Sequence, residues 1–507
     1  MPAPALVFVG FMGAGKSTAA REAAAVLDAR LHDSDRLLEA EFGSTIEAFF
    51  DAHGEAAFRE REEALVLRLL DAADGDVIAL GGGTLASARV REALGRHLVV
   101  HVEVDLETAW TRAAGKGRPL ARDRAVFEAR YAERASTYRS VARATLPPAD
   151  KKVGRRAARA LRDLADAPAG TQLLWATAAS GDYPVLVGRR LLGQVPWPLG
   201  GRRFVVSDAN VGDLYAGLVG EVSGLIEIGA GEEHKTLATA ERVWEALVEQ
   251  GATRADHVVA VGGGVVGDLA GFCASAYQRG VPVIQVPTTV VAQVDSAYGG
   301  KTGVDLPTAK NYVGAYHQPS AVVVDVATLA TLPPEEHAAG YAEVVKTALI
   351  AGGALWEQVA SGVPVDDATI LGCARTKLAV VREDERDGGR RQVLNLGHTV
   401  GHAIETVSGF ARYRHGEAVG LGLLAALRLS GQEDLRAHVR DLLEGVGLPV
   451  ELDPQLDAAE IVAATAKDKK RLGEHTPFVL IHGPGDVRHG AVVAPSDVLA
   501  AVAELHG

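Results

Sequence analysis

Residues 10–17 read Gly-Phe-Met-Gly-Ala-Gly-Lys-Ser, which matches the pattern G-x-x-x-x-G-K-[ST]. A short apolar run, Leu6–Val9, precedes this stretch, and an amphipathic stretch over 17–30 follows it. In such a strand–loop–helix arrangement the glycines let consecutive backbone N–H groups face the phosphates of a nucleotide at a helix N-terminus. Lys16 would reach the β- and γ-phosphates, and the Ser17 hydroxyl would bind Mg²⁺. The stretch therefore predicts an α/β domain that binds a nucleoside triphosphate.

Short apolar runs and amphipathic stretches alternate outward from this loop. Further strands are expected at 76–80 and 98–102, and a second helix over 55–72. This alternation predicts a parallel sheet with crossover helices. A second series of strand patterns begins near residue 173, and helical patterns dominate after residue 332. The expected organisation is α/β over 1–165, a linker over 166–172, α/β over 173–332 and mainly α over 333–507.

The composition limits the classes of protein to which the chain can belong. It has 507 residues, of which 48% are hydrophobic, so it can form several buried cores and is not a disordered chain. The 57 glycines follow no G-x-y period, which excludes collagen. The net charge of −13 argues against general binding to nucleic acids or to anionic membranes.

Cysteine usage and apolar runs bear on the cellular compartment. Cys273 and Cys373 lie far apart and form no Cys-x-x-Cys pair, which fits a reducing compartment and argues against a disulfide framework or a cysteine zinc site. The apolar start lacks the basic residues of a signal peptide. The runs at 258–267 and 418–427 are too short to cross a bilayer. We therefore expect a cytoplasmic protein.

Several polar features follow the first loop in order. Asp35 lies in an Asp-x-Asp pair, Arg59 in Gly-Glu-x-x-Phe-Arg, and Gly81–Gly83 at the end of a predicted strand. Arg118 begins an Arg-Pro-Leu triplet suited to a lid, and Arg134 lies on a following helix. Each feature alone also fits a helix cap, a strand-end turn or a surface arginine. Together, over residues 4–165, they resemble the shikimate kinase family.

This resemblance implies a role for each feature. Arg59 and Arg134 would pair with the carboxylate of shikimate, for which a guanidinium fork is well shaped. Asp35 would orient the attacking hydroxyl, and Arg118 would stabilise charge on the transferred phosphoryl group. Ala121 departs from the leucine that is usual after Arg-Pro-Leu, and the lid is short, so we expect altered lid kinetics. The residues implied to bind ATP, Mg²⁺ and shikimate are Gly13, Ala14, Gly15, Lys16, Ser17, Thr18, Asp35, Arg59, Gly81, Gly82, Gly83 and Arg134.

A second glycine-rich stretch, Gly-Gly-Gly-Val-Val-Gly-Asp over 262–268, follows a predicted strand and precedes a predicted helix. This placement suits a pyrophosphate, although the stretch is not G-x-G-x-x-G and does not by itself establish a dinucleotide site. Thr288 and Thr289 close the next strand with two hydroxyl donors. Lys301 and Lys310 lie beside glycine-rich turns, which is not expected of lysines on a solvated charged face.

The helical region holds residues that could bind a metal ion. Glu343 and Lys346 lie one helical turn apart. His398 and His402 are four residues apart, and His415 opens a further helix. A carboxylate with two imidazoles and an open position is the composition of a catalytic zinc site. Because these residues lie on three separate segments, spacing alone also allows each histidine an ordinary hydrogen-bonded role in the core or at the surface.

Seven motifs follow one another between residues 173 and 505: GGGVVGDLAGF (262–272), PTTVVAQVDSAYGGKTG (287–303), KNYVGAYHQP (310–319), AEVVK (342–346), LNLGHTVGHAIE (394–405), HGEAVG (415–420) and DKK (468–470). Through these motifs the region resembles the 3-dehydroquinate synthase family. This family converts 3-deoxy-arabino-heptulosonate 7-phosphate to 3-dehydroquinate and phosphate, and regenerates NAD⁺ in each turnover. Oxidation of a ring hydroxyl acidifies the neighbouring C–H, so that phosphate can leave by β-elimination; hydride then returns, the ring opens and an aldol step closes the carbocycle.

The second resemblance also implies residue roles. Glu343, His398 and His415 would hold Zn²⁺ or Co²⁺, which polarises the reacting hydroxyl. The residues implied to bind NAD⁺ are Asp208, Glu232, Lys235, Gly264, Val265, Val266, Gly267, Asp268, Thr288, Thr289, Lys301, Lys310, Thr328 and Thr331. Those implied around the substrate and its phosphate are Arg279, Asp295, Lys301, Asn311, Lys346, Lys377, Arg391, Asn395, His402 and Lys469, with Lys470 as the alternative to Lys469.

Two positions depart from the synthase pattern. Asp387 stands where glutamate is usual, and Asp305 stands where asparagine is usual. Neither is an implied metal ligand, so we expect altered kinetics and retained activity. The whole sequence then predicts a fusion of a kinase and a synthase that uses ATP with Mg²⁺, NAD⁺ and Zn²⁺ or Co²⁺, as a homodimer formed through the synthase. The alternatives are a related sugar-phosphate cyclase or polyol dehydrogenase in the second half, or a non-catalytic regulatory module in either half.

Overall fold

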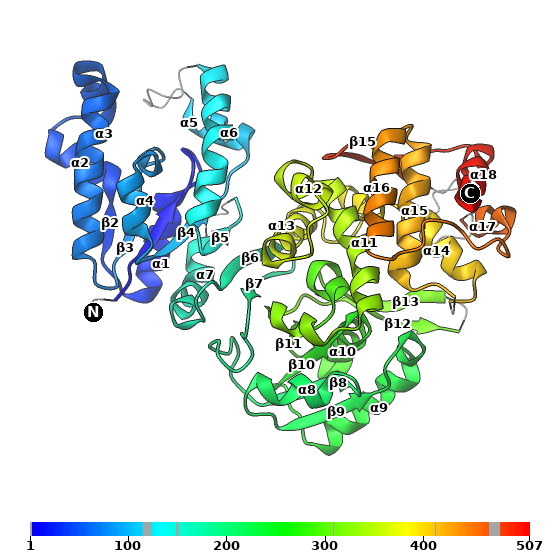
Figure 1. Ribbon diagram of the computed structural model, residues 1–507. Helices are drawn as coiled ribbons and strands as arrows, with labels where there is room; N and C mark the ends of the chain where they lie inside the picture. The colour runs from blue at the N-terminus through cyan, green and yellow to red at the C-terminus, as the bar shows by residue number, and fades with distance from the viewer. Residues whose placement is uncertain (1–2, 115–122, 149–151, 308, 411, 466–476) are drawn as a thin grey trace. The chain divides into compact units, whose positions relative to one another are not determined.

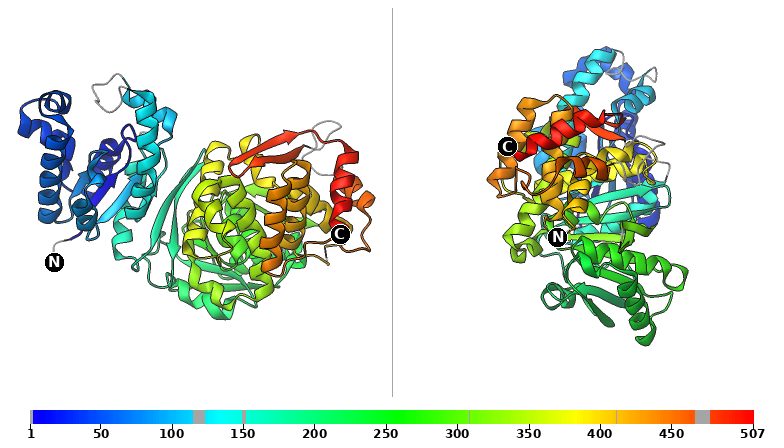
Figure 2. Two further views of the ribbon diagram at one scale, coloured as in Figure 1. Left: turned by 45° about the horizontal axis from the view of Figure 1, so that its top comes forward. Right: turned by 90° about the vertical axis from the view of Figure 1, so that its right-hand side faces the viewer.

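The structure is a computed structural model that describes residues 3–114, 123–148, 152–307, 309–410, 412–465 and 477–507 (Figures 1 and 2). The chain divides into two compact units, Met1–Ala176 with Asp182–Pro198 and Thr177–Gly181 with Leu199–Gly507. Arg118, Lys469 and Lys470, which sequence analysis assigned to the active sites, lie outside the described residues, as does Ala121.

A sheet runs through the first unit, and its first six strands in sequence pair in parallel, as predicted (Figure 1). Strand β6 (Gln172–Ala178) pairs in parallel with β5 (Ala144–Leu146), with Leu173 opposite Ala144. The strand at which sequence analysis began the second α/β region thus continues the sheet of the first unit, and the domain limits stay a prediction. The strands lie in the order β2 (Leu31–Asp33), β3 (Val77–Ala79), β1 (Leu6–Val9), β4 (Leu98–Val102), β5 (Ala144–Leu146), β6 (Gln172–Ala178) and β7 (Gly181–Gly188).

The helices of the first unit pack with small side chains at their contacts. The buried face of α1 (Lys16–Leu27) consists of Ala19, Ala20, Ala23 and Ala24. A Cβ at Gly154 of α7 (Val153–Asp163) would collide with the backbone oxygen of Ala19. Only glycine therefore allows α7 so close to α1. The helices are α1 (Lys16–Leu27), α2 (Ser34–Phe42), α3 (Ile46–Ala72), α4 (Ala88–Leu94), α5 (Leu106–Ala113), α6 (Arg124–Val141) and α7 (Val153–Asp163).

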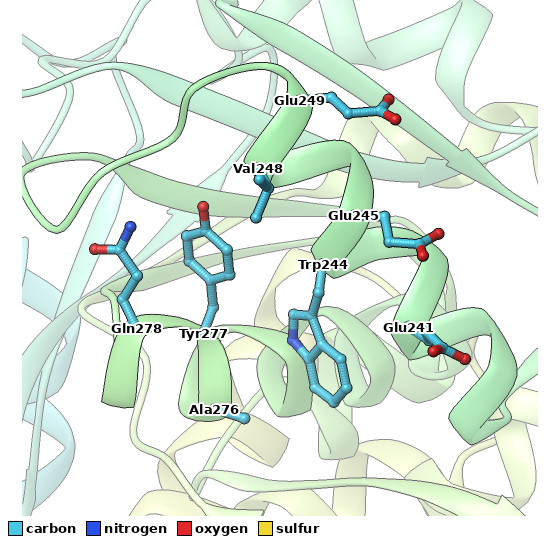
Figure 3. A pocket seen from close by; sticks show the side chains of 8 residues that line it. All are labelled: Glu241, Trp244, Glu245, Val248, Glu249, Ala276, Tyr277 and Gln278. Carbon is cyan, nitrogen blue, oxygen red and sulfur yellow. The ribbon is translucent and has the colours of Figure 1, made fainter.

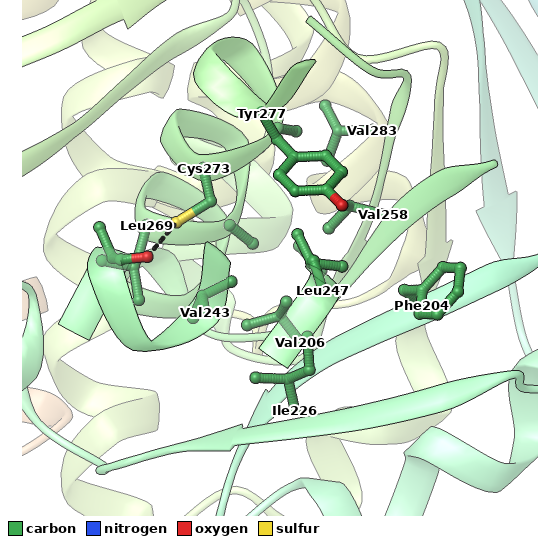
Figure 4. Packing of buried hydrophobic residues seen from close by; sticks show 14 of the residues in the cluster. Phe204, Val206, Ile226, Val243, Leu247, Val258, Leu269, Cys273, Tyr277 and Val283 are labelled. Atoms are coloured by element: carbon green, nitrogen blue, oxygen red, sulfur yellow. Dashed lines mark hydrogen bonds between the residues drawn. The ribbon is translucent and has the colours of Figure 1, made fainter. Parts of the chain in front are cut away.

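The second unit contains its own parallel strands, in the order β14 (Ala321–Asp325), β11 (Val283–Pro287), β10 (His257–Gly262), β8 (Arg203–Asp208) and β9 (Gly224–Ile228). Helices α9 (Leu237–Glu249) and α10 (Gly264–Ala276) pack on these strands. Figure 4 shows the resulting core, in which Val243 of α9 and Leu269 of α10 lie among strand residues such as Val206 and Val258. An antiparallel hairpin of β12 (Lys301–Leu306) and β13 (Ala309–Tyr316) follows.

The rest of the second unit is mainly helical, as predicted, and its yellow to red helices lie against one another (Figures 1 and 2). None of the helices in the described parts of the chain is both long and apolar enough to cross a membrane. The elements are α8 (Gly212–Tyr215), which precedes this part, and α11 (Pro334–Ala351), α12 (Gly353–Ala360), α13 (Asp367–Glu383), α14 (His398–Val407), α15 (His415–Leu429), α16 (Glu433–Gly445), α17 (Ala458–Thr465), β15 (Phe478–Gly483), β16 (Asp486–Ala491) and α18 (Pro495–Ala503).

Candidate active sites

The first predicted loop connects the C-terminal end of β1 to the start of α1. Gly13 and Gly15 have φ angles of 82° and 92°, and a Cβ at Gly13 would lie 2.9 Å from the backbone oxygen of Ala109. Among the described residues no side chain caps the N-terminus of α1, and an uncapped helix N-terminus favours an anionic ligand. Lys16 Nζ donates to the backbone oxygen of Phe11 at 3.1 Å, which holds the ammonium at the loop. The loop is therefore shaped for phosphate.

The polar residues predicted for shikimate surround the end of β3. A Cβ at Gly81 would lie 2.7 Å from Asp35 Oδ1, and a Cβ at Gly83 would collide with the guanidinium group of Arg59. Arg134 Nη1 donates to the backbone oxygen of Gly82 at 3.0 Å. The structure thus brings together a carboxylate, two guanidinium groups and a glycine turn, which sequence analysis took from four segments.

Glu62 is a member of this cluster that sequence analysis missed. Its buried carboxylate accepts from Arg59 Nη1 at 2.5 Å and from Thr84 Oγ1 at 2.8 Å. Burial lowers the pKa of Arg59, but the adjacent Glu62 and Glu55 outweigh burial and raise it, so the guanidinium stays charged. The i,i+3 spacing of Arg59 and Glu62, on the part of α3 that follows a kink at Gly54, was the available signal.

Tyr138 and Arg112 are two further residues that the predictions did not include. The hydroxyl of Tyr138 donates to the backbone oxygen of Gly82 at 2.5 Å, beside Arg134. Burial raises the pKa of Tyr138 to about 12, so it remains a donor at neutral pH. Arg112 Nη1 donates to the backbone oxygen of Gly13 at 3.2 Å, which places a second cation at the phosphate loop.

In the second unit, the predicted nucleotide residues gather where the parallel strands β8, β10 and β11 end. Asp208 ends β8, Gly264 begins α10 directly after β10, and Thr288 follows β11. The Thr288 hydroxyl is buried and has no hydrogen-bond partner among the described residues. Such a hydroxyl beside a helix N-terminus fits a ligand with phosphate oxygens. The carboxyl end of an open parallel sheet is where dinucleotides bind in α/β folds, so the residues present fit NAD⁺.

Lys235 lies at the centre of a buried polar cluster beside this edge. Its Nζ is 2.7 Å from Glu232 Oε1, 3.4 Å from Asp268 Oδ2, and donates to Asn311 Oδ1 at 2.9 Å. Burial raises the pKa of Asp268 to about 6, against the lowering effect of Lys235. Asp305, one of the two departures, accepts from the backbone N–H of Asn311 at 2.7 Å. This bond supports Asn311 at φ 57°, which few non-glycine residues adopt.

The three predicted metal ligands meet in the helical part. Glu343 lies on α11, His398 begins α14 and His415 begins α15, and their candidate ligand atoms all lie within 4.8 Å of one another. Glu343 Oε1 is 3.5 Å from His398 Nε2 and 3.3 Å from His415 Nε2. Desolvation lowers the pKa of His415, but Glu343 and Glu405 raise it to about 10. One buried carboxylate and two imidazoles converging in an anionic setting fit a divalent transition-metal ion.

Cationic residues predicted for the substrate adjoin this centre. Asp295 Oδ1 is 2.7 Å from Lys377 Nζ and 3.7 Å from Lys346 Nζ, and Lys346 is also paired with Glu343. Burial raises the pKa of Asp295, but the two lysines outweigh it and hold the value at about 2. Burial lowers the pKa of Lys377 to about 8 despite this pair. The ring of His402 lies 5.2 Å from that of His398.

Other predicted residues are held by contacts of their own. Arg391 is buried and donates to the backbone oxygens of Gly299 and Glu385. Lys301 pairs with Asp387, the second departure, at 2.5 Å. Asn395 ends a short helix just before His398. The threonines Thr328 and Thr331 lie in the turn after β14; the hydroxyl of Thr328 accepts from Gln293 Nε2, and that of Thr331 bonds to Tyr215.

Arg279 is placed differently from these residues. It is exposed in the turn Tyr277–Arg279, beyond the C-terminal end of α10, whereas Gly264 and Asp268 lie in the first turns of that helix. A helix of 13 residues is about 20 Å long. The structure therefore separates Arg279 from the nucleotide edge of its own chain.

A groove of about 690 Å³ lies on the surface beside this turn (Figure 3). Glu241, Trp244, Glu245, Val248 and Glu249 of α9 line one side of it, and residues 276–278 line the other. Among the described residues, none of those predicted for substrate, nucleotide or metal lines this groove. We therefore do not assign either active site to it.

Comparison with known proteins identifies the two halves. The shikimate kinase family model matches residues 12–165, and the models of the N-terminal and C-terminal parts of 3-dehydroquinate synthase match 225–339 and 340–471. The 3-dehydroquinate synthase of Geobacter metallireducens is 44% identical over 301 residues, which cover 55% of this chain and 83% of that protein. The 3-dehydroquinate synthase of Desulforamulus reducens is 41% identical over 348 residues, 64% of this chain and 97% of that protein.

Solved structures with a similar fold include two other synthases. A 2-deoxy-scyllo-inosose synthase complexed with carbaglucose-6-phosphate, NAD⁺ and Co²⁺ is 27% identical, with a TM-score of 0.60, covering 66% of this chain and 100% of that one. The 2-epi-5-epi-valiolone synthase of Streptomyces hygroscopicus subsp. jinggangensis, with NAD⁺ and Zn²⁺ bound, is 28% identical, with a TM-score of 0.59, covering 64% of this chain and 96% of that one. From the 3-dehydroquinate synthases that match at higher identity, and from the kinase family model, we conclude that the chain belongs to the 3-dehydroquinate synthase family and carries a shikimate kinase domain ahead of the synthase.

Proposed function

We propose that this bifunctional shikimate-pathway enzyme phosphorylates the 3-hydroxyl of shikimate with Mg²⁺-ATP in its first unit. In its second unit it converts 3-deoxy-arabino-heptulosonate 7-phosphate to 3-dehydroquinate and phosphate, with NAD⁺ and Zn²⁺ or Co²⁺. The observation that carries the synthase assignment is the convergence of Glu343, His398 and His415 beside the Asp295–Lys377 pair. A metal-binding donor set next to buried cations suits a phosphorylated polyol.

In the kinase, the chain supplies binding and orientation. The phosphate loop and Lys16 hold the nucleotide, and Ser17 in the first turn of α1 would bind Mg²⁺. Arg59 and Arg134 hold the carboxylate of shikimate, with Glu62 fixing the Arg59 guanidinium. Asp35 then accepts a hydrogen bond from the attacking hydroxyl and directs it toward the γ-phosphate.

In the synthase, NAD⁺ when bound would accept hydride from the substrate and the metal ion would polarise the hydroxyl that is oxidised. The buried lysines Lys346 and Lys377 hold the anionic groups of the substrate and stabilise the phosphate as it leaves. Asp295 keeps both ammonium groups fixed. Arg391 stiffens the wall of this site through its bonds to the backbone oxygens of Gly299 and Glu385.

A related sugar-phosphate cyclase is the alternative, since two of the structural neighbours are synthases with other names. Phosphate release should be measured with 3-deoxy-arabino-heptulosonate 7-phosphate and with sedoheptulose 7-phosphate, and we expect kcat/KM to favour the first. We expect this preference because 3-deoxy-arabino-heptulosonate 7-phosphate carries a carboxylate, which can pair with the buried cations. A preference for sedoheptulose 7-phosphate would overturn the proposed reaction.

The kcat/KM of the synthase is expected to fall above about pH 8. Burial lowers the pKa of Lys377 to about 8, so its ammonium is present below this pH and is lost above it. Each further pH unit should then lower kcat/KM about tenfold, since this parameter reports ionisations of the free enzyme. Lys377→Arg keeps its charge over the whole range and should shift the alkaline limb upward by at least about one unit. The same limb in both proteins would show that another group titrates.

A homodimer formed through the synthase unit is part of the proposal. The position of Arg279 supports it, because this residue is exposed and lies about one helix length from the nucleotide edge of its own chain. We therefore expect Arg279 to bind the substrate in the active site of a second copy and not in that of its own chain.

A further inference from the structure

Glu405 contacts both halves of the proposed cofactor machinery. Its side chain is 4% exposed and lies on α14. One carboxylate oxygen, Oε2, accepts from His415 Nδ1 at 3.3 Å, and the other, Oε1, accepts from Lys310 Nζ at 3.2 Å. A single buried carboxylate thus joins a proposed metal ligand to a lysine proposed to bind NAD⁺.

Helix geometry explains the first of these contacts. Glu405 is seven residues, or two turns, after His398, and both therefore lie on one face of α14. Helix α15, which begins at His415, packs closely against this helix, since a Cβ at Gly401 would lie 3.0 Å from the backbone oxygen of Ala418. Because His415 Nδ1 is bonded to Glu405, its Nε2 faces Glu343. A carboxylate behind a histidine ligand fixes the ring and its tautomer.

The second contact leads toward the nucleotide edge. Lys310 lies on β13, and its Nζ is also 4.5 Å from the centre of the Phe410 ring. The next residue along the strand, Asn311, accepts from Lys235 Nζ at 2.9 Å, in the cluster that contains Asp268 of α10. A continuous series of polar contacts therefore runs from His415 through Glu405 and the hairpin to the helix that begins at the nucleotide loop.

We propose that Glu405 is a positioning residue that couples metal binding to NAD⁺ binding, so that each raises the affinity of the enzyme for the other. A metal ion fixes the His415 ring, the ring fixes the carboxylate through Nδ1–H, and the carboxylate fixes the ammonium of Lys310. The inference depends on the proposed function, because it takes the metal and NAD⁺ sites from it. None of the residue roles implied by the family resemblance includes Glu405.

The test measures binding with the full-length protein after removal of its metal. Titration calorimetry gives the NAD⁺ affinity with and without Zn²⁺, and competition with a chromophoric chelator gives the Zn²⁺ affinity with and without NAD⁺. In the wild type each ligand should raise the affinity for the other by about 5- to 150-fold, and by the same factor in both directions. In Glu405→Gln this factor should fall to within about twofold of one, because the amide has no charge and cannot accept from both partners.

Two further variants separate positioning from a general loss of structure. Lys310→Met should abolish the coupling while the Zn²⁺ affinity measured without NAD⁺ stays as in the wild type. Glu417→Gln removes a carboxylate from the first turn of α15 that is bonded to Arg414, and should retain the coupling. Coupling that persists in both Glu405→Gln and Lys310→Met would overturn the inference.

Measurements on the wild type alone distinguish a failure of this inference from a failure of the proposed function. If the wild type binds Zn²⁺ and NAD⁺ with no mutual effect, the inference is wrong and the proposed function stands. If the wild type binds neither ligand, the proposed function and the inference both fail.

Discussion

Replacement of Lys16 by alanine is expected to abolish ATP-dependent phosphorylation of shikimate and to leave the synthase reaction of the same chain unchanged. The Lys16 ammonium is held at the phosphate loop by its bond to the backbone oxygen of Phe11. There it can follow the β- and γ-phosphates as negative charge redistributes during transfer. Loss of a preorganised donor to developing charge typically lowers kcat by about 10²- to 10³-fold, and loss of a full charge should cost at least as much.

The measurement is a coupled assay for ADP release with shikimate, beside an assay for phosphate release by the synthase, on one preparation. Arg96→Ala is the matched control, because it removes an exposed cation just before β4, at the end of the parallel sheet opposite the phosphate loop. It should retain kinase activity. If Lys16→Ala kept more than about a tenth of the wild-type kcat, the assignment of the loop would be wrong. A wild type without kinase activity would instead favour a regulatory role for this domain.

Removal of metal is expected to have the second large effect, this time on the synthase alone. Polarisation of the reacting oxygen by a bound cation supplies several kcal/mol of stabilisation, and about 4 kcal/mol corresponds to roughly a 10³-fold loss of rate. After treatment with a chelator the synthase should be inactive, and Zn²⁺ or Co²⁺ should restore it. Kinase activity, assayed with Mg²⁺ supplied, should be the same before and after.

A variant ties this metal dependence to the predicted ligands. His398→Ala should stay inactive at Zn²⁺ concentrations that restore the wild type, because one of three converging ligand atoms is gone. His482→Ala, which removes an exposed histidine of β15, should respond to metal as the wild type does. Full activity in the metal-free wild type would refute the assignment of Glu343, His398 and His415.

Much of the fold could be predicted because its signals are local. The turn from strand to helix at residues 10–17 needs glycines at left-handed φ angles, and the structure has them at Gly13 and Gly15. The predicted helix over 55–72 corresponds to the part of α3 after the kink at Gly54. The start of a second domain at residue 173 was harder to judge, because an apolar strand pattern does not say which neighbour it pairs with. Strand β6 pairs with β5.

The sequence predicted which residue types form the two sites, but not every residue that belongs to them. The motifs contained the metal-binding residue types, and two family resemblances supplied their roles. Glu62 and Glu405 were given no role, because each acts by holding another side chain, although Glu405 ends the motif over 394–405. A buried carboxylate on a helix looks in sequence like any surface acid. Its burial and its partners depend on neighbouring elements.

The sequence by itself determined the phosphate loop, the parallel α/β organisation and the residue types available for catalysis. These follow from backbone sterics and from periodicity within one strand or helix. Only the tertiary structure decided that Glu343, His398 and His415 meet, since their relative positions depend on how α11, α14 and α15 pack. The tertiary structure also placed Arg279 beyond the far end of α10 and joined Lys310 to His415 through Glu405. Distances between elements arise from packing and sheet register, which spacing along the chain does not encode.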